Sequence, residues 1–272
     1  MQQQEKESVR QYWNHVPCGT GDVTYQEGSL EYFEAIAAKR DRLEPFISDY
    51  AEFGKWAGKR VLEVGCGVGS DLLRFAQAGA NAVGIDLSSK SALLAKSRLR
   101  LYNCPGEVLV ADAENLPFAE GEFELIYSWG VLHHTPDTGS AVHEIYRVTK
   151  PGGEVRIMLY HRHSLVALQM YVMFGLLSCR PFRNLKDIIA RYHESPGTKA
   201  YTVSEVRKLF SEFQKVKVEI RLTPYDLRYR RDRYLPAWAG RLVPKCLGWF
   251  MVIRGHKPDS ANQSHPERHG GI

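Results

Sequence analysis

The sequence predicts an α/β protein with a seven-stranded, mostly parallel sheet, an antiparallel last strand, helices on both faces and an α-helical cap. Two observations predict this class. Short apolar runs alternate with amphipathic helical segments over residues 60–160, which is typical of parallel sheets covered by helices. The last two apolar runs, 215–221 and 247–254, have no segment of helical period between them. We therefore expect these two strands to pair antiparallel.

The elements follow from the positions of these runs. The other predicted strands are 60–64, 82–86, 107–111, 123–128 and 153–160, with helices at 71–78, 88–101 and 141–148 between them. A helix over 5–15 and a second helical stretch that ends near Pro45 precede the sheet. Helices at about 164–178, 184–193 and 204–213 follow the fifth strand.

Length and composition fit a single folded unit with additions. The chain has 272 residues, of which 44% are hydrophobic and 25% charged, so it can bury a core. We divide it into an N-terminal helical lid (1–55), a cofactor-binding core (56–160), a helical cap insertion (161–200), the end of the core (201–256, with a basic insertion at 222–246) and a polar tail (257–272) that we predict to be disordered.

Charge and cysteine usage exclude several classes. The net charge of +5 and the pI near 8.9 are too mild to indicate nucleic-acid binding by themselves. Five single cysteines without a CxxC pair predict neither a disulfide framework nor a metal site. The N-terminus lacks the apolar segment of a secretory signal, and the apolar stretch 165–177 is too short to span a bilayer. These features favour a cytoplasmic setting.

A glycine turn follows the first predicted strand, where the chain reads Glu63-Val64-Gly65-Cys66-Gly67-Val68-Gly69-Ser70-Asp71. Glycine has no Cβ, so this backbone can fold tightly and approach a ligand. Open α/β sheets bind nucleotides at such strand ends. A purely structural turn is the alternative interpretation.

Polar residues also end the next three strands. Asp86 comes 23 residues after Glu63, where a carboxylate can accept hydrogen bonds from ribose hydroxyls. Asp112 and Ala113 follow the third strand, where a carboxylate can accept a hydrogen bond from an adenine amino group. Ser128 is the last residue of the fourth strand. Four polar or glycine-containing strand ends facing one crevice are hard to explain by packing alone.

A glycine turn followed by an acidic strand end suits two cofactors, a dinucleotide or S-adenosylmethionine, and the charges of the neighbouring residues distinguish them. A dinucleotide site requires GxGxxG, whereas Ser70 holds the third glycine position here. Asp71 would also repel a pyrophosphate at the helix N-terminus. S-adenosylmethionine carries no phosphate, and its ammonium and sulfonium groups suit the neighbouring Glu63 and Asp71.

Five motifs in order carry a family resemblance: 61–69, Gly84-Ile85-Asp86-Leu87-Ser88, 112–118, Tyr127-Ser128-Trp129-Gly130-Val131-Leu132-His133-His134 and Arg147-Val148-Thr149-Lys150-Pro151-Gly152-Gly153. Over residues 58–160 the sequence resembles the class I S-adenosylmethionine-dependent methyltransferases of the type 11 branch, which have a Rossmann-like fold. It differs from the quinone C-methyltransferases at His133-His134, and it lacks the cysteine expected there in arsenite methyltransferases.

The resemblance implies a set of cofactor-binding residues. The Gly65 and Gly67 backbone would hold the methionine end, Asp86 the ribose, and Asp112 with Ala113 the adenine. Ser128 and Trp129 would line the cofactor near the sulfonium. The remaining cofactor-binding candidates are their neighbours in the same motifs: Glu63, Cys66 and Leu87.

Histidines are the candidates for acceptor activation. His134, and less so His133, would lie beside the transferred methyl, where a neutral imidazole can act as general base. A loop-shaping hydrogen bond is the alternative. Zinc binding is not expected, because no cysteine or aspartate stands at ligand spacing.

The additions outside the sheet supply the candidates for acceptor binding: Tyr12 and Trp13 in the lid, Tyr160 and His161 after the fifth strand, and Arg228 in the basic insertion. The helix near 164–178 is core, a wall for a lipophilic acceptor, or a membrane-surface contact. The arginine-rich segment 221–241 has three interpretations: a solvated surface, an anion site or an RNA surface.

Together these features predict a methyltransferase that methylates an oxygen or nitrogen of a small organic metabolite. Carbon and sulfur are the alternative methylated atoms, and lipophilic and anionic metabolites are the candidate acceptors. The alternatives are an RNA or membrane-lipid methyltransferase, and a non-catalytic protein that binds S-adenosylmethionine and serves as a partner. We do not expect nucleic acid as a partner. Peripheral contact with a membrane stays an open alternative, and no oligomeric state is predicted.

Overall fold

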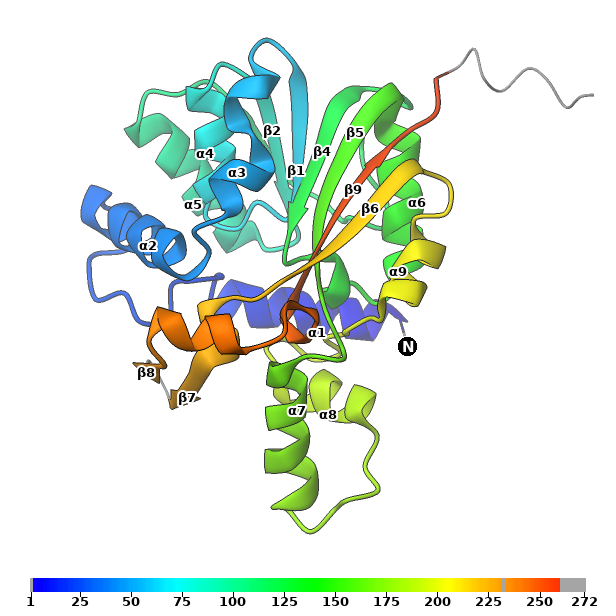
Figure 1. The fold of residues 1–272 in the computed structure, drawn as a ribbon. Helices are drawn as coiled ribbons and strands as arrows, with labels where there is room; N and C mark the ends of the chain where they lie inside the picture. The colour runs from blue at the N-terminus through cyan, green and yellow to red at the C-terminus, as the bar shows by residue number, and fades with distance from the viewer. Residues whose placement is uncertain (1, 231–232, 260–272) are drawn as a thin grey trace, which may run out of the picture.

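A single seven-stranded sheet organises the molecule (Figure 1). The computed structural model describes residues 2–230 and 233–259. The strand order is β3-β2-β1-β4-β5-β9-β6, and only β9 runs antiparallel to its neighbours, so the predicted fold class is confirmed. The strands are β1 Arg60–Val64, β2 Asn81–Asp86, β3 Glu107–Val110, β4 Phe123–Trp129, β5 Thr149–Tyr160, β6 Gln214–Arg221 and β9 Phe250–His256, beside a small ribbon of β7 Arg228–Arg230 and β8 Arg233–Tyr234.

Helices cover both faces of the sheet. Helices α3, α4 and α5 pack on one face, and α6 and α9 on the other. The helices are α1 Gln2–His15, α2 Leu30–Leu43, α3 Ile47–Ala51, α4 Ser70–Gln77, α5 Ser89–Leu101, α6 Thr138–Val148, α7 Leu165–Tyr171, α8 Leu185–Tyr192 and α9 Val203–Leu209. Shorter helical turns are η1 Phe53–Trp56, η2 Leu132–His134, the π-helical η3 Val172–Leu176, η4 Pro224–Leu227, η5 Ala237–Leu242 and η6 Lys245–Leu247.

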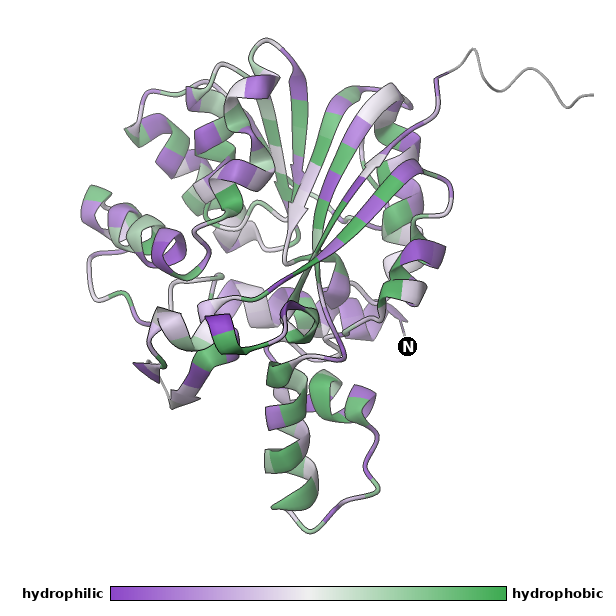
Figure 2. Cartoon of the chain, viewed as in Figure 1, coloured by the Kyte–Doolittle hydropathy of each residue, from purple (hydrophilic) through white to green (hydrophobic). Residues whose placement is uncertain are grey.

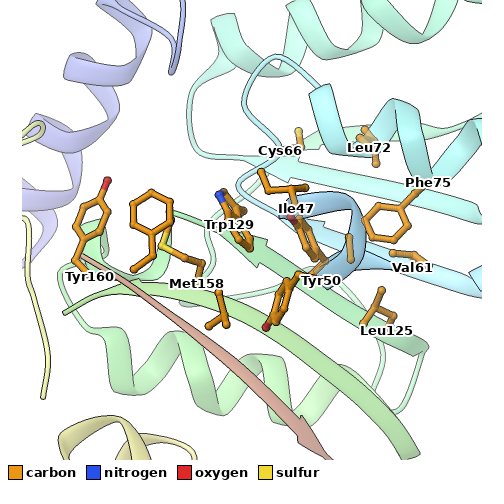
Figure 3. Packing of buried hydrophobic residues seen from close by; sticks show 14 of the residues in the cluster. Ile47, Tyr50, Val61, Cys66, Leu72, Phe75, Leu125, Trp129, Met158 and Tyr160 are labelled. Carbon is orange, nitrogen blue, oxygen red and sulfur yellow. The ribbon is translucent and has the colours of Figure 1, made fainter. Parts of the chain in front are cut away.

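Aromatic side chains dominate the core on the α3–α5 face (Figure 3). Tyr50 of α3 packs against Trp129 at the end of β4, with ring centroids 5.6 Å apart. Phe75 of α4 is fully buried against Tyr127, at 5.3 Å. Burying a side chain of this size stabilises a fold by ~1.5–3 kcal/mol. The core therefore fixes the end of β4 firmly in place.

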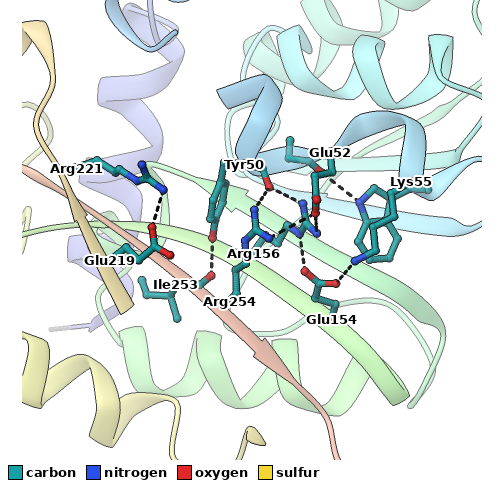
Figure 4. Close-up of polar contacts among 11 residues, drawn as sticks. Tyr50, Glu52, Lys55, Glu154, Arg156, Glu219, Arg221, Ile253 and Arg254 are labelled. Carbon is teal, nitrogen blue, oxygen red and sulfur yellow. Dashed lines mark hydrogen bonds and ion pairs between the residues drawn. The ribbon is translucent and has the colours of Figure 1, made fainter. Parts of the chain in front are cut away.

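A buried arginine ties α3 and η1 to the sheet (Figure 4). Arg156 on β5 is fully buried, and its Nε donates to Glu154 Oε1 at 2.6 Å. Its other nitrogens donate to the Tyr50 carbonyl and to the Glu52 carboxylate. Arg254, opposite Arg156 on β9, also donates to the Tyr50 carbonyl, at 3.0 Å. Every polar group of this cluster has a partner, which is what a buried charge requires.

Several predicted boundaries move by a few residues. Helix α9 ends at Leu209 rather than at residue 213, because the chain turns there and buries Phe210 and Phe213. Strand β9 begins at Phe250, three residues after the predicted start at 247, because η6 occupies 245–247.

The predicted start of the disordered tail at residue 257 is too early. Lys257 is buried, and its backbone N–H donates to the Gly153 carbonyl at 3.0 Å, so this residue is still part of the fold. Residues 260–272 lie outside the described part of the chain.

A helical hairpin of α7 and α8 extends away from the sheet (Figure 1), and many of its residues are hydrophobic (Figure 2). Its inner face is buried through Met170, Ile188 and Ile189. Leu177 is 76% exposed and Phe182 is fully exposed at the outer end. Within the described residues, no helix combines the length and apolar character that a bilayer span needs.

Candidate cofactor and acceptor site

The turn between β1 and α4 forms the floor of the site. Gly65 (φ 75°) and Gly67 (φ 52°) adopt left-handed backbone conformations that favour glycine. A Cβ on Gly65 would overlap the Val131 side chain, whereas a Cβ on Gly67 would meet no atom within 4 Å. Gly65 thus permits close packing, and Gly67 leaves open space over the turn for a ligand.

Asp86 at the end of β2 holds this turn in shape. Its Oδ2 accepts the Gly67 N–H at 2.9 Å, and its Oδ1 accepts the Ser88 N–H at 2.8 Å. Burial raises the pKa of Asp86 to about 6, against the opposing effect of these two hydrogen bonds. The predicted ribose-binding carboxylate is therefore also a structural part of the glycine turn.

The two acidic residues that flank the turn have different surroundings. Glu63 is 3% exposed, and its Oε2 has no hydrogen-bond partner among the described residues. Burial, and next the Asp71 carboxylate, raise the pKa of Glu63 well above its usual value. Asp71 instead pairs with Arg40 at 2.5 Å and accepts the Tyr127 hydroxyl at 2.8 Å. This corrects the expectation that both acids face the cofactor, because Arg40 already neutralises Asp71.

A cavity of about 400 Å³ opens over these strand ends. Its lining includes most of the predicted cofactor-binding residues: Glu63, Gly65, Cys66, Gly67, Asp86, Leu87, Asp112, Ala113 and Trp129. A volume of this size is typical of small-molecule sites. The Glu63 oxygen without a hydrogen-bond partner can accept a hydrogen bond from the ammonium group of S-adenosylmethionine. The residues present therefore fit this cofactor.

Ser128 is an exception among the predicted cofactor residues. Its side chain is fully buried, and its hydroxyl donates to the Val64 carbonyl at 2.9 Å. Successive side chains of a strand point to opposite faces, so only the neighbouring Trp129 reaches the cavity. The indole N–H of Trp129 donates to Glu44 Oε2 at 2.6 Å. Ser128 is thus a structural residue that joins β4 to β1.

Helix α1 covers the end of the cavity at Asp112. Its Lys6 contacts Asp112 at 2.5 Å and Glu114 at 2.7 Å. Trp13 lines the cavity, whereas Tyr12 is 37% exposed and packs edge-on against Trp13 at 4.9 Å. The structure therefore places Trp13 at the predicted site and Tyr12 outside it.

The two adjacent histidines are not equivalent. His133 is fully buried, stacks on Tyr160 at 3.8 Å between ring centroids, and has no hydrogen-bond partner among the described residues. Burial, and next His134, lower the pKa of His133 well below its usual value. His133 does not line the cavity, which corrects its assignment as a base candidate. His134 does line it.

Both ring nitrogens of His134 have neighbours. Nδ1 lies 2.9 Å from the Ser195 hydroxyl and 3.0 Å from the Thr198 hydroxyl. Nε2 lies 3.1 Å from Glu194 Oε2. Ligand atoms of His133, His134 and Glu194 also lie within 4.8 Å of one another, an arrangement that could hold a metal ion. No sequence spacing showed this, because Glu194 comes from the distant cap.

Two residues predicted to bind the acceptor are placed behind the cavity instead. Tyr160 is buried, stacks on Trp249 at 4.4 Å and donates its hydroxyl to Glu194 Oε2 at 3.0 Å. His161 is buried, and its Nδ1 lies 3.1 Å from the Gly248 carbonyl. Both therefore support the site without lining it, because the chain leaves β5 on the inner side of the cap.

The basic insertion contributes part of the cavity wall. Arg228, Tyr225 and Tyr234 line it, while Tyr229 (61%) and Trp238 (62%) are largely exposed. The Tyr225 hydroxyl donates to Glu44 Oε1 at 3.2 Å. Sequence reasoning missed Glu44 and Glu194, since neither stands in a recognisable motif. The predicted wall from the helix near 164–178 is wrong for this cavity, because its lining includes no residue of α7 or η3.

Comparisons with known proteins give one consistent family. Residues 62–157 match the family described as "Methyltransferase domain". An uncharacterised methyltransferase of Synechocystis sp. is 40% identical over 110 residues, 39% of this chain and 50% of that protein. A ubiquinone biosynthesis O-methyltransferase of Aromatoleum aromaticum is 38% identical over 110 residues, 39% of this chain and 46% of that protein. These matches span about half the length of the relatives or less.

Solved structures agree on the fold. A magnesium protoporphyrin IX methyltransferase from Synechocystis, with bound S-adenosylhomocysteine, superimposes with a TM-score of 0.58 and 15% identity. The match covers 93% of this chain and 99% of that one. The sheet and its glycine turn define a Rossmann-like α/β fold. Within that class, residues 62–157 match the methyltransferase domain family, and the proteins of similar sequence or fold include S-adenosylmethionine-dependent methyltransferases.

Proposed function

We propose that this chain transfers a methyl group from S-adenosylmethionine to an oxygen or nitrogen of a small organic acceptor. One observation carries the proposal. A single cavity joins the glycine turn and the orphaned Glu63 oxygen to a second end lined by His134, Glu194, Tyr225 and Arg228. The name of the ubiquinone biosynthesis O-methyltransferase favours oxygen as the methylated atom.

The bound cofactor supplies an electrophilic methyl group on a sulfonium. The residues of the chain bind and orient the two reactants, and such positioning accounts for a large part of the rate of a displacement reaction. We infer that Gly67, Glu63 and Trp129 hold the cofactor end, and that α1 covers it through Lys6 and Trp13. The five cysteines are unpaired, in keeping with the cytoplasmic setting that we propose.

Calorimetry and a product assay test this function. Titration of the full chain with S-adenosylmethionine should release binding heat, and titration with NAD should not. Incubation with panels of hydroxylated aromatics and amines should release S-adenosylhomocysteine. Binding of S-adenosylmethionine without turnover of any acceptor would favour a non-catalytic partner protein. Binding of NAD alone would refute the assignment.

The α7–α8 hairpin favours a lipophilic acceptor reached at a membrane surface. Exposed side chains on its outer side include Leu168 (55%), Met173 (54%), Leu177 and Phe182. Exposed apolar clusters of this kind mark interaction sites. The cations Arg180, Arg183, Lys186 and Arg191 follow the exposed stretch, with Asp187 as the one acid between residues 178 and 191. Apolar groups beside cations suit an anionic lipid surface.

Flotation with lipid vesicles tests this contact. The wild-type chain should float with vesicles that contain phosphatidylglycerol, and the double variant Leu177→Ser with Phe182→Ser should lose most of that binding. Leu93→Ser is a matched control, because Leu93 is 62% exposed on α5, away from the hairpin. Equal flotation of the double variant would refute the membrane contact. Salt-sensitive retention on RNA would favour the nucleic-acid alternative.

A further inference from the structure

We propose that Glu194 is the residue that binds the acceptor hydroxyl and takes up its proton, and that the acceptor is therefore an O–H donor such as a phenol. This inference rests on the proposed methyl transfer and assigns a catalytic residue to it. No sequence pattern indicates this role, because Glu194 lies in the segment between α8 and α9, far from every methyltransferase motif.

The two oxygens of the Glu194 carboxylate have different surroundings. Oε2 accepts the Tyr160 hydroxyl at 3.0 Å, lies 3.1 Å from His134 Nε2 and lies 3.9 Å from His193 Nε2. Oε1 has no hydrogen-bond or ion-pair partner in the described part of the chain. Glu194 lines the cavity, and its side chain is 34% exposed. The carboxylate is thus anchored through one oxygen and offers the other to a ligand.

Both ring nitrogens of His134 face groups of the chain. Nδ1 lies between the Ser195 and Thr198 hydroxyls, and the Thr198 hydroxyl also donates to the Ser195 carbonyl at 2.6 Å. Nε2 lies 3.1 Å from Glu194 Oε2. Neither nitrogen is thus directed at an acceptor in the cavity. His134 is therefore a positioning residue for Glu194, together with Tyr160.

The protonation state of Glu194 suits this role. Its Oε2 faces the Tyr160 hydroxyl and ring nitrogens of His134 and His193, all of which can stabilise the anionic form. The side chain is thus an anion at neutral pH and a hydrogen-bond acceptor for the incoming hydroxyl. An oxygen that has just gained a methyl group is a far stronger acid than a carboxylic acid, so even this weak base can deprotonate it.

The transfer balances in atoms and electrons. A lone pair of the acceptor oxygen forms the new bond to the methyl carbon, and the carbon–sulfur bond breaks with its electron pair going to sulfur. The O–H bond electrons then return to the acceptor oxygen as its proton passes to Glu194 Oε1. The products are the methyl ether, S-adenosylhomocysteine and the protonated side chain, which loses its proton to water after product release.

Binding of 4-nitrophenol tests the proposal without knowledge of the natural acceptor. The neutral and ionised forms of this probe absorb at different wavelengths. Titrated at neutral pH into the chain loaded with S-adenosylhomocysteine, it should bind in its neutral form, so the absorbance of the phenolate should fall. Glu194→Gln should weaken binding at least 10-fold and abolish this fall, while the affinity for S-adenosylhomocysteine stays within twofold of wild type.

Three controls make the test decisive. Glu219→Gln, on the exposed edge strand β6, should behave like wild type (Figure 4). Tyr160→Phe removes one anchor of Oε2 and should weaken probe binding two- to fivefold. Dialysis against EDTA should leave probe binding unchanged, and a loss that zinc restores would overturn the proposal in favour of a metal at His133, His134 and Glu194.

The remaining outcomes separate this proposal from the proposed function. Unchanged probe binding by Glu194→Gln, or failure of the wild-type chain to bind 4-nitrophenol, would overturn the role of Glu194. Failure of the wild-type chain to bind S-adenosylhomocysteine would instead overturn the methyltransferase function itself.

Discussion

The two ends of the cavity are built by different means. The cofactor end consists of strand-end turns whose parts are near neighbours in sequence, such as Asp86 holding Gly67 across 19 residues. The proposed acceptor end is assembled from the cap and the basic insertion, where Thr198 contacts His134 across 64 residues and Tyr225 contacts Glu44 across 181. Local motifs thus build one end of the cavity, whereas contacts between distant segments build the other.

The largest effect is expected from Gly65→Val, which tests whether the glycine turn alone supports the cofactor end. The new side chain would overlap Val131, and a β-branched residue is strained at φ 75°. Calorimetry should detect no binding of S-adenosylmethionine. Gly67→Ala is the matched comparison, because its Cβ meets no atom within 4 Å; it should stay folded and bind more weakly. Wild-type affinity in Gly65→Val would contradict the comparison.

The next largest effect is expected from Arg156→Ala, which tests whether the sheet can be destabilised without changing ligand binding in the cavity. It would remove one partner each from the buried Glu154, which also pairs with Lys55 at 2.8 Å, and from the Tyr50 carbonyl, which also accepts from Arg254. Breaking a buried ion cluster costs about 3–5 kcal/mol. Urea unfolding should show this loss, while S-adenosylmethionine affinity of the folded variant should change less than threefold. A loss below about 1 kcal/mol would mean that Arg254 and Lys55 replace Arg156.

Asp86 should make the stability of the ligand-free chain depend on pH. Its pKa of about 6 in the folded protein exceeds the usual 3.8, so the folded state binds the proton more tightly than the unfolded one. The stabilisation is therefore full below about pH 4 and is lost as the pH rises through 6, by on the order of 3 kcal/mol. Asp86→Asn should flatten this part of the profile in urea unfolding at several pH values. An identical slope in the variant would refute the assignment.

The smallest effect is expected from Thr198→Val, which tests the independence of the acceptor end. Removing the hydroxyl leaves His134 Nδ1 and the Ser195 carbonyl each short of one partner, at a cost of about 1–2 kcal/mol. Binding of 4-nitrophenol should weaken severalfold, and binding of S-adenosylmethionine should not change. Equal losses for both ligands would show that the two ends are coupled.

The sequence predicted the frame well for identifiable reasons. Short apolar runs such as 60–64 and 123–128 match β1 and β4 because buried parallel strands need continuous apolar residues. Ends of elements were less predictable. Helix α9 stops early because Phe210 and Phe213 turn inward, which is a tertiary contact and not a local preference.

Site residues divide in the same way. Gly65, Asp86 and Asp112 line the cavity because strand ends fix where those backbones lie. Ser128, Tyr160 and His133 were misplaced, because the direction of one side chain depends on its packing neighbours.

By itself, the sequence determined the sheet, the glycine turn and the class of cofactor, since these depend on hydrophobic period, on backbone freedom and on the charge of residues close in the chain. Only the tertiary structure decided that Arg40 pairs with Asp71, that a buried oxygen of Glu63 lacks a hydrogen-bond partner among the described residues, and that Glu194 lines the cavity. The physical reason is that the charge and hydrogen bonding of a side chain depend on which groups folding brings within about 4 Å of it.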